Sequence, residues 1–397
     1  MVFLGLLLIA AISIGIAIPI IISYTNPSTD SCSGAYISAI STHDSTSHKG
    51  KIMIVGGATY KDGHNFYYNT TEIIDLDDEN SSCHLTTDYP YKASLIQAGG
   101  LNVCGKLKNV FCSGGTEYVI LRSCYEYSTD GFLEMSDFHM NQVIGSASAV
   151  QISDDFGEQL LWIMGGRDSD YMLQSSTQLI SYTRGLLKGP EMPDKIVNHC
   201  AVALKNTTVM VIGGQSGPEW EDRSQTYWYN FELEQWIHGP DLSIARGRHA
   251  CAVFETENET RIYVVGGVNQ QFDDLDSVEI AVLDQDSLET MEWKWTEGKV
   301  LKELHCSTVH RNLIFPGPKF PFGIREHALV STKLGLYAVG GYRWKSNDEE
   351  DNYSDSIFEL NPISNNSTWI ELPQKMIVPR SYVAALFLPK EFSVTCQ

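Results

Sequence analysis

Basic residues are scarce in this chain. Its 397 residues include 28 Lys and Arg against 49 Asp and Glu, which gives a formal net charge of −21 and a pI near 4.8. Nucleic-acid binding needs a basic footprint, and docking on an anionic membrane surface needs basic clusters. The composition therefore argues against both kinds of partner.

Common catalytic motifs are missing as well. The chain contains no Gly-x-Ser-x-Gly elbow, no phosphate-binding loop and no His-Glu-x-x-His segment. Heptads and long amphipathic helical stretches are also absent, so a helical architecture is not expected. The sequence assigns no catalytic, cofactor-binding or metal-binding residue and predicts no cofactor.

Glycine pairs, by contrast, recur through most of the chain. Six times a short apolar run leads directly into Gly-Gly, at intervals of 58, 51, 48, 53 and 74 residues. Such a period indicates one supersecondary unit copied several times. The apolar run suits a strand buried on both faces, and glycine ends it because glycine reaches positive φ cheaply and lets another backbone approach. The pairs are Gly56 and Gly57, Gly114 and Gly115, Gly165 and Gly166, Gly213 and Gly214, Gly266 and Gly267, and Gly340 and Gly341.

Three further strand-like segments accompany most of these pairs. One is a Ser/Thr-led apolar run such as Thr70–Ile74, and the next often carries Trp and a Pro turn, as in Trp236–Leu242. The last leads back to the following pair with small and apolar residues, as in His249–Phe254. Turn residues separate the segments, so each unit is predicted to hold four antiparallel strands.

This pattern resembles the kelch repeat, and so do the stretches Arg246–His249 and Pro379–Tyr382. The resemblance implies an all-β, six-bladed kelch β-propeller around a central channel. We expect the propeller over residues 51–390 and a C-terminal tail over 391–397. Ser381–Leu388 has no seventh glycine pair behind it, so we expect it to complete the first blade and close the ring, with Ala35–Ile40 as the alternative.

The N-terminal stretch Val2–Ile22 carries no charge. It is long enough to span a bilayer core of about 30 Å, whereas the apolar region of a signal peptide covers about 7–15 residues after a basic segment, which is missing here. We expect a helical signal-anchor over residues 1–23, with a cleaved signal peptide as the alternative, and a stalk over 24–50. No Lys or Arg occurs between this stretch and Lys49, so the following segment is free to be translocated.

N-glycosylation sequons agree with a propeller outside the cytosol. Seven Asn-x-Ser/Thr sequons fall in predicted loops or near strand ends, more than chance would place there. The candidate sites are Asn69, Asn80, Asn206, Asn258, Asn352, Asn365 and Asn366.

Nine cysteines fit the same oxidising compartment. Cys112 and Cys124 lie on neighbouring predicted strands joined by a short loop, which brings them within disulfide reach. Cys83 and Cys104 flank the crossover from the first blade to the second. Both spacings resemble those of secreted kelch-type proteins, and we expect a disulfide in each pair.

The remaining cysteines are less constrained. Cys32 and Cys396 form a candidate pair that would tie the two chain ends together, whereas Cys200 and Cys251 are expected to be small apolar fillers on inner strands. Because nine is odd, at least one thiol stays free or pairs with another chain in a disulfide-linked oligomer. Cys306 is the candidate.

Acidic and aromatic residues gather in the loops after the glycine pairs. In kelch propellers these loops share one face of the disk, so the resemblance implies a face that takes a cationic partner or Ca²⁺; acids in loops also serve solubility. The candidate ligand-face residues are Asp168, Asp170, Trp220, Asp273, Asp274, Trp344, Asp348 and Glu349.

Histidines recur at equivalent positions of three predicted inner strands, as His199, His249 and His327. Such repetition indicates a structural role, in which each His opens a strand and caps a loop. The sequence favours an extracellular or lumenal binding scaffold, anchored at the cell surface or secreted, that presents propeller loops to a protein or glycan ligand. The alternative is a secreted kelch-type enzyme, either a copper-radical oxidase or a carbohydrate-active enzyme, that uses the channel mouth.

Overall fold

The computed structural model describes residues 49–389 with interruptions at 81–82, 85–86, 95, 104–105, 113, 117–118, 129, 137, 142–143, 155, 205–207, 258, 284–292, 298–317, 345–351 and 364–366. The predicted signal-anchor, nearly all of the stalk and the C-terminal tail lie outside the described residues. The described part belongs to one compact unit of the chain. It contains no α-helix, and therefore no helix that could cross a membrane.

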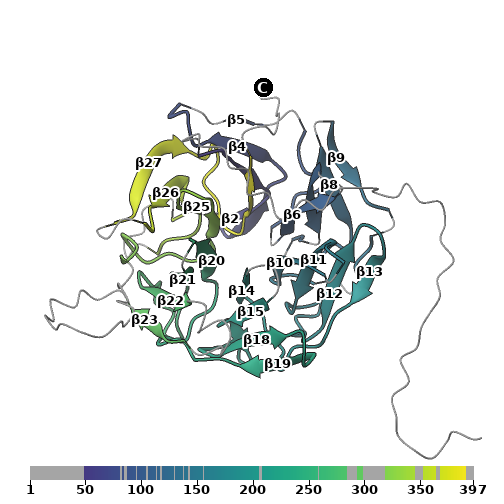
Figure 1. Ribbon diagram of the computed structural model, residues 1–397. Coiled ribbons are helices and arrows are strands. Elements are labelled where there is room, and N and C mark those ends of the chain that lie inside the picture. Colours follow the sequence, from purple (N-terminus) through teal and green to yellow (C-terminus); the bar gives the residue numbers. More distant parts are fainter. Residues whose placement is uncertain are drawn as a thin grey trace, which may run out of the picture. The chain divides into compact units, whose positions relative to one another are not determined.

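Six antiparallel four-stranded sheets surround a central channel as the blades of a propeller (Figure 1). From the channel outward, blade 1 contains β28 (Ala384–Leu388), β1 (Lys51–Val55), β4 (Thr71–Asp75) and β5 (Cys83–His84). Blade 2 contains β6 (Gln97–Val103), β7 (Lys106–Cys112), β8 (Cys124–Ser128) and β9 (Gly131–Glu134). Blade 3 contains β10 (Ser148–Ser153), β11 (Gln159–Met164), β12 (Thr177–Ser181) and β13 (Gly185–Lys188).

The second half of the ring follows the same plan. Blade 4 contains β14 (Cys200–Leu204), β15 (Thr208–Ile212), β18 (Thr226–Asn230) and β19 (Gln235–His238). Blade 5 contains β20 (Ala250–Glu255), β21 (Thr260–Val265), β22 (Val278–Leu283) and β23 (Trp295–Glu297). Blade 6 contains β24 (Ala328–Ser331), β25 (Leu336–Val339), β26 (Ser356–Leu360) and β27 (Ile370–Lys375). Two small hairpins project from loops, β2 (Ala58–Lys61) with β3 (His64–Tyr67), and β16 (Gln215–Ser216) with β17 (Glu221–Asp222).

The C-terminal strand completes the first blade, as predicted. β28 pairs with β1 in antiparallel register, with Val55 opposite Ala384 and Lys51 opposite Leu388. Each inner strand also contacts its two neighbours in the series β6, β10, β14, β20, β24 and β28, and β28 contacts β6. The ring is therefore closed, and each inner strand is flanked by the inner strands of both neighbouring blades.

The hydrophobic core is divided among the junctions between blades. Six clusters of buried side chains occur, and each joins two neighbouring blades. In the cluster between blades 1 and 2, Met53 and Val55 pack with Phe111 and Tyr125. The two faces of each sheet are thus covered by the two neighbouring blades, which explains the uninterrupted apolar runs in the sequence.

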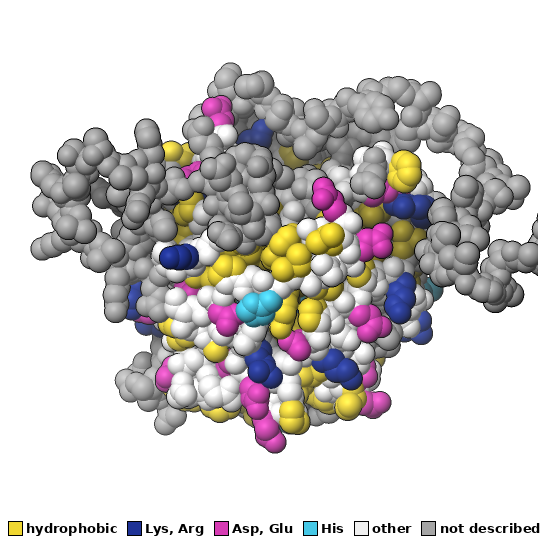
Figure 2. Space-filling model, turned by 60° about the horizontal axis from the view of Figure 1, so that its bottom comes forward, with side chains coloured by type: hydrophobic (Ala, Val, Ile, Leu, Met, Phe, Trp, Pro, Cys, Tyr) yellow, Lys and Arg dark blue, Asp and Glu magenta, His cyan; other side chains and the backbone are white. Residues whose placement is uncertain are grey.

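On the outside, acidic, basic and apolar side chains are interspersed over the side of the molecule drawn in Figure 2.

The glycine pairs are required by close packing, in blade 4 against the next blade for the first glycine and against the entry to the blade's own inner strand for the second. In blade 4, Gly213 and Gly214 have φ angles of +55° and +101°. A Cβ on Gly213 would lie 2.8 Å from His249 Cε1, and a Cβ on Gly214 would lie 2.6 Å from His199 Cβ. Any side chain at either position would thus meet both an unfavourable backbone conformation and a clash. This accounts for the recurrence of the pair at the end of each second strand.

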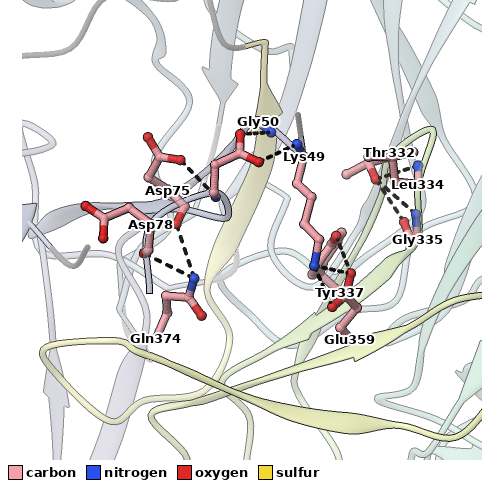
Figure 3. A network of polar contacts seen from close by, with 11 residues as sticks. Lys49, Gly50, Asp75, Asp78, Thr332, Leu334, Gly335, Tyr337, Glu359 and Gln374 are labelled. Carbon is pink, nitrogen blue, oxygen red and sulfur yellow. Dashed lines mark hydrogen bonds and ion pairs between the residues drawn. The ribbon is translucent and has the colours of Figure 1, made fainter. Parts of the chain in front are cut away.

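Polar contacts reinforce the junction between blades 6 and 1 (Figure 3). Lys49 Nζ lies 2.8 Å from Glu359 Oε2, and the Tyr337 hydroxyl donates to Glu359 Oε1 at 2.8 Å. Gln374 Nε2 donates to the backbone oxygen of Asp78 at 3.1 Å. These contacts join segments that are about 300 residues apart in the chain. They support the closure that the pairing of β28 with β1 makes.

Candidate binding face

One face of the ring collects two kinds of segment, and we call it the glycine-pair face. It consists of the loops that follow the glycine pairs and the segments that enter the inner strands. Short antiparallel bridges join the two kinds of segment, as between Val197 and Gln215 in blade 4 and between Arg325 and Tyr342 in blade 6. The loops that hold the predicted ligand-face residues therefore share this one face.

A series of backbone hydrogen bonds follows the channel mouth on this face through the described residues of blades 3, 4, 5, 6 and 1. Five residues at equivalent positions, each just before an inner strand, have φ between +54° and +59°: Ser146, Asn198, Arg248, Glu326 and Tyr382. From Asn198 onward, each backbone N–H donates to the carbonyl oxygen of the preceding member of the series at 2.9–3.0 Å. Positive φ is uncommon for residues other than glycine and is held only where the surroundings enforce it. The rim of the channel mouth is therefore a fixed frame.

Side chains on this frame neutralise one another. Glu326 Oε1 accepts from Arg248 Nη1 at 2.9 Å and from the Tyr382 hydroxyl at 2.6 Å. Glu326 Oε2 accepts from the Ser381 hydroxyl at 3.0 Å. Burial, together with the carboxylate of Glu326, raises the pKa of Tyr382, so its hydroxyl keeps its proton and remains a donor. The cavity at the mouth has a volume of 170 Å³, and its two charged lining residues, Arg248 and Glu326, pair with each other.

The three repeated histidines also line this cavity. Burial lowers the pKa of His199, His249 and His327 to about 3, so all three imidazoles are neutral at pH 7. His249 Nε2 lies 3.1 Å from the carbonyl oxygen of Ile212, the residue before a glycine pair. Their packing against the glycine pairs agrees with the structural role expected for them. In the part of the chain that is described, no three His, Cys, Asp or Glu side chains are placed to hold a metal ion together.

A larger cavity of 520 Å³ lies between the loops of blades 5 and 6, and we call it the blade 5–6 pocket. It brings together three of the predicted ligand-face residues, Asp273, Asp274 and Trp344. Phe272 and Trp344 flank it with exposed fractions of 81% and 66%. The other lining residues are Gly323 and Arg325. The pocket thus combines two open aromatic side chains with charged groups of both signs.

The charges of the pocket are unequally partnered. Asp274 Oδ1 lies 2.9 Å from Arg325 Nη1, and Asp274 Oδ2 accepts from the backbone N–H of Trp344 at 2.7 Å. Burial raises the pKa of Asp274 above its ordinary value, although Trp344 and Arg325 act in the opposite direction. The guanidinium of Arg325 also lies over the ring of Tyr342, 4.5 Å from its centroid. Asp273 is exposed, and the hydrogen bond that its side chain makes to a described residue is with the Asn269 amide, at 3.3 Å.

Arg325 was not predicted from the sequence. The sequence feature that could have indicated Arg325 is its position before an inner strand, since Arg325 precedes Glu326 and His327 as Gly247 precedes Arg248 and His249. That register places it beside the loop of the neighbouring blade. No motif marks it as a charged group of a pocket.

The predicted residues of blade 3 have a different role. Asp168 Oδ1 accepts from the backbone N–H groups of Asp170 and Met172 at 3.0 and 2.9 Å, and Asp168 Oδ2 accepts from Gln174 Nε2 at 3.0 Å. Asp168 therefore builds its own turn, as such residues commonly do. Asp170 is exposed and Trp220 of blade 4 is half-buried, both away from the blade 5–6 pocket. Asp348 and Glu349 lie outside the described residues.

Two disulfides occur among the described residues. One joins Cys112 of β7 to Cys124 of β8 within blade 2. The other joins Cys200 of β14 to Cys251 of β20, with their Cα atoms 5.9 Å apart, so the expectation that these two cysteines are apolar fillers was wrong. Inner strands of neighbouring blades run side by side, and this brings the two thiols together.

The other cysteines are only partly described. Cys83 is also disulfide-bonded, whereas its expected partner Cys104 lies outside the described residues. Cys32, Cys306 and Cys396 lie outside them too.

Three of the seven sequons fall in the described part of the chain. Asn80 is exposed, Asn69 is half-buried, and Asn352 is half-buried with its Nδ2 donating to the Tyr342 hydroxyl at 3.3 Å. Asn206, Asn258, Asn365 and Asn366 lie outside the described residues. An attached glycan would fit most easily at Asn80, because that side chain already faces solvent.

Comparison of the chain with known protein-family models and with curated protein sequences gives no match. The geometry of the glycine-pair face is therefore what bears on function. It offers a channel mouth whose charged groups, Arg248 and Glu326, are paired and, beside it, a pocket with open aromatic walls and one carboxylate that no described base partners.

Proposed function

We propose that the protein is an extracellular or lumenal binding scaffold of the kelch type, which presents the loops of its glycine-pair face to a protein or glycan ligand. The carrying observation is the blade 5–6 pocket with its two exposed aromatic walls. Exposed apolar groups next to convergent polar groups mark binding sites in soluble proteins.

Exposed apolar side chains on other blades support this assignment. The loops after the glycine pairs carry Tyr60 in blade 1, Val119 in blade 2 and Met172 in blade 3, which are 57%, 59% and 58% exposed. With Phe272 and Trp344, five of the six blades present such a residue around the channel mouth. The rigid blades hold these loops in place, so little ordering entropy is lost when a ligand binds.

Two kinds of evidence support the proposed extracellular or lumenal location. Disulfides persist in oxidising compartments, and the chain has Cys112–Cys124, Cys200–Cys251 and a bonded Cys83. The sequons and the uncharged N-terminal stretch agree with export. Kelch membership is supported by the six glycine pairs, each of which ends the second strand of a blade.

We favour binding over catalysis because the acid that lines the channel mouth is committed to neighbouring groups. This acid, Glu326, is held by Arg248, Ser381 and Tyr382. A general acid or base would need a proton-exchanging oxygen that faces a substrate.

Binding by the full-length protein to glycan and cell-surface protein arrays tests the proposal. The double variant Phe272→Ala/Trp344→Ala removes both walls of the pocket. Phe156→Ala is the matched control, since Phe156 is 85% exposed in the turn before β11, at the opposite face. We expect a ligand whose binding falls at least about tenfold in the double variant and is unchanged in the control. Equal binding by all three proteins would overturn the proposal.

A further inference from the structure

We infer that the blade 5–6 pocket binds a cationic group, namely the ammonium or guanidinium of a Lys or Arg side chain on a protein partner. The inference rests on the proposed function and names the ligand chemistry of its pocket. Three features of the pocket carry it: its aromatic walls, its unpartnered carboxylate and the fixed positions of both.

The walls are suited to a cation. Phe272 and Trp344 expose most of their surface at the edge of a 520 Å³ cavity, a volume within the range of about 300–1,000 Å³ typical of ligand sites. A cation near the face of an aromatic ring is attracted by the negative charge of the ring face, most strongly with Trp. Two such walls at one cavity form the open part of an aromatic cage.

The charge of the pocket has the complementary sign. Its charged lining residues are two carboxylates and one guanidinium, which leaves one negative charge. Arg325 is occupied by Asp274 at 2.9 Å, and its Nε lies 3.7 Å from Glu326. Among the residues that the structure describes, no Lys or Arg lies within ion-pair distance of Asp273, whereas Asp274 and Asp276 are paired. Asp273 is therefore the acid available to a ligand.

The pocket is arranged before any ligand arrives. Asn269 Oδ1 accepts from the backbone N–H groups of Gln271 and Asp273 at 3.0 and 2.9 Å, which fixes the turn that carries Phe272 at a φ of +63°. The bond from the Trp344 N–H to Asp274 then ties the loop of blade 6 to that of blade 5 at 2.7 Å. A preformed cage binds more tightly because the loops need not be ordered on binding.

Other ligands fit less well. A Ca²⁺ ion takes six to eight oxygen ligands, but both oxygens of Asp274 are in use and the described residues form no cluster of three metal-binding side chains. A sugar would need several free hydrogen-bonding groups, and among the described lining residues Asp273 is the charged group left open. The net charge of −21 adds long-range attraction for a cationic partner.

The experiment compares two small probes of the same shape. N-acetyl-arginine methylamide carries the guanidinium, and N-acetyl-citrulline methylamide replaces it with a neutral urea. Each is titrated against the full-length protein, with dissociation constants from NMR shifts or calorimetry. We expect the arginine probe to bind about 3- to 30-fold more tightly, the range that a cation–aromatic attraction supports.

Variants locate the site. Trp344→Ala and Asp273→Asn should each weaken the arginine probe about 3-fold or more. Asp170→Asn is the matched control, because it removes one exposed acid from the corresponding turn of blade 3. Circular dichroism melts establish that each variant is folded.

Three results would overturn the inference: no binding of the arginine probe, equal affinity for both probes, or equal losses in Asp170→Asn and Asp273→Asn. The proposed function fails separately. One outcome that separates the two is a glycan from the array that requires Phe272 and Trp344 for binding. The other is a protein ligand whose binding is unchanged by Asp273→Asn. Either outcome would support the binding scaffold and overturn the inference of a cationic ligand.

Discussion

The guanidinium of Arg380 lies 3.0 Å from the carboxylate of Glu72, and neither side chain is exposed to solvent. Blade 5 repeats the arrangement with Arg246 and Glu279 at 2.7 Å, again fully buried. In both of these blades the Arg precedes the inner strand and the Glu lies on the third strand from the channel. The pair in blade 1 therefore joins the C-terminal segment to a strand near the start of the propeller.

Breaking this pair should destabilise the ring strongly. Glu72→Gln leaves the buried charge of Arg380 without a counter-charge, and such losses amount to about 3–5 kcal/mol. Chemical denaturation of the full-length protein measures the effect. Lys188→Met is the control, because its partner Glu191 is 3.5 Å away and both side chains are exposed, so its loss should be about 1 kcal/mol or less. Equal losses in the two variants would show that the buried pair has no special weight.

The two disulfides should contribute unequally to stability. In the chain-entropy description, a link across 51 residues stabilises by about 4 kcal/mol and one across 12 residues by about 3 kcal/mol. Cys200→Ala/Cys251→Ala should therefore lower the free energy of unfolding more than Cys112→Ala/Cys124→Ala. Peptide mapping without reductant should recover both linked pairs. Free thiols at Cys200 and Cys251 in the native protein would contradict the assignment.

Acid should destabilise the propeller through its buried histidines. Burial lowers the pKa of His327 from 6.5 to about 3, so between these values the unfolded chain binds a proton that the folded protein does not. Stability contributed by this group is complete above pH 6.5 and is lost as the pH falls toward 3. His327→Asn should reduce the slope of unfolding free energy against pH, between pH 4 and 6, by about 1.4 kcal/mol per pH unit.

Val383→Ala is the control for that slope. It shortens an apolar side chain that lines the same cavity and changes no titratable group. The slope should therefore match that of the unaltered protein. If His327→Asn leaves the slope unchanged, the imidazole is protonated alike in both states and the explanation from burial fails.

Alanine substitutions at two glycines with positive φ can separate the cost of backbone strain from the cost of a packing clash. Gly185 has a φ of +75° and nothing within 4 Å of an added Cβ, so Gly185→Ala should cost about 1–2 kcal/mol from the backbone alone. Gly214 has a φ of +101°, and an added Cβ would lie 2.6 Å from His199 Cβ. Gly214→Ala should cost about 3 kcal/mol or more, because the backbone that enters the inner strand of the same blade must shift to accept the methyl group. Thermal and denaturant unfolding provide the comparison, and similar losses would mean that this backbone segment yields easily.

The architecture could be predicted because its causes are local and repeated. Gly213 and Gly214 signal a strand end and a close approach within a few residues of sequence, and five further copies report the same event. Ring closure followed from Ser381–Leu388, an inner strand without a glycine pair of its own. The pairing of β28 with β1 confirms it.

Contacts between blades were harder to predict. Cys200 and Cys251 are 51 residues apart, and no local pattern says that their strands touch; only the equivalence of their positions beside His199 and His249 could have suggested it. Acids in the loops were predicted as a set, but the roles of Asp168 and Asp273 differ. Asp168 starts its turn and accepts the hydrogen bonds that close it, as Asn269 does in blade 5, whereas Asp273 ends its turn and faces the pocket.

The pairing of β28 with β1 has a consequence for folding during synthesis of the protein. Among the described strands, β1 leaves the ribosome first and β28 last. Blades 2 to 6 can therefore form before β28, the inner strand of blade 1, has been synthesised. A chain cut short by a premature stop codon within β28 would keep an open strand edge that other nascent chains can join. Completion of the ring therefore depends on a single sheet, the one that combines the first and the last of the described strands.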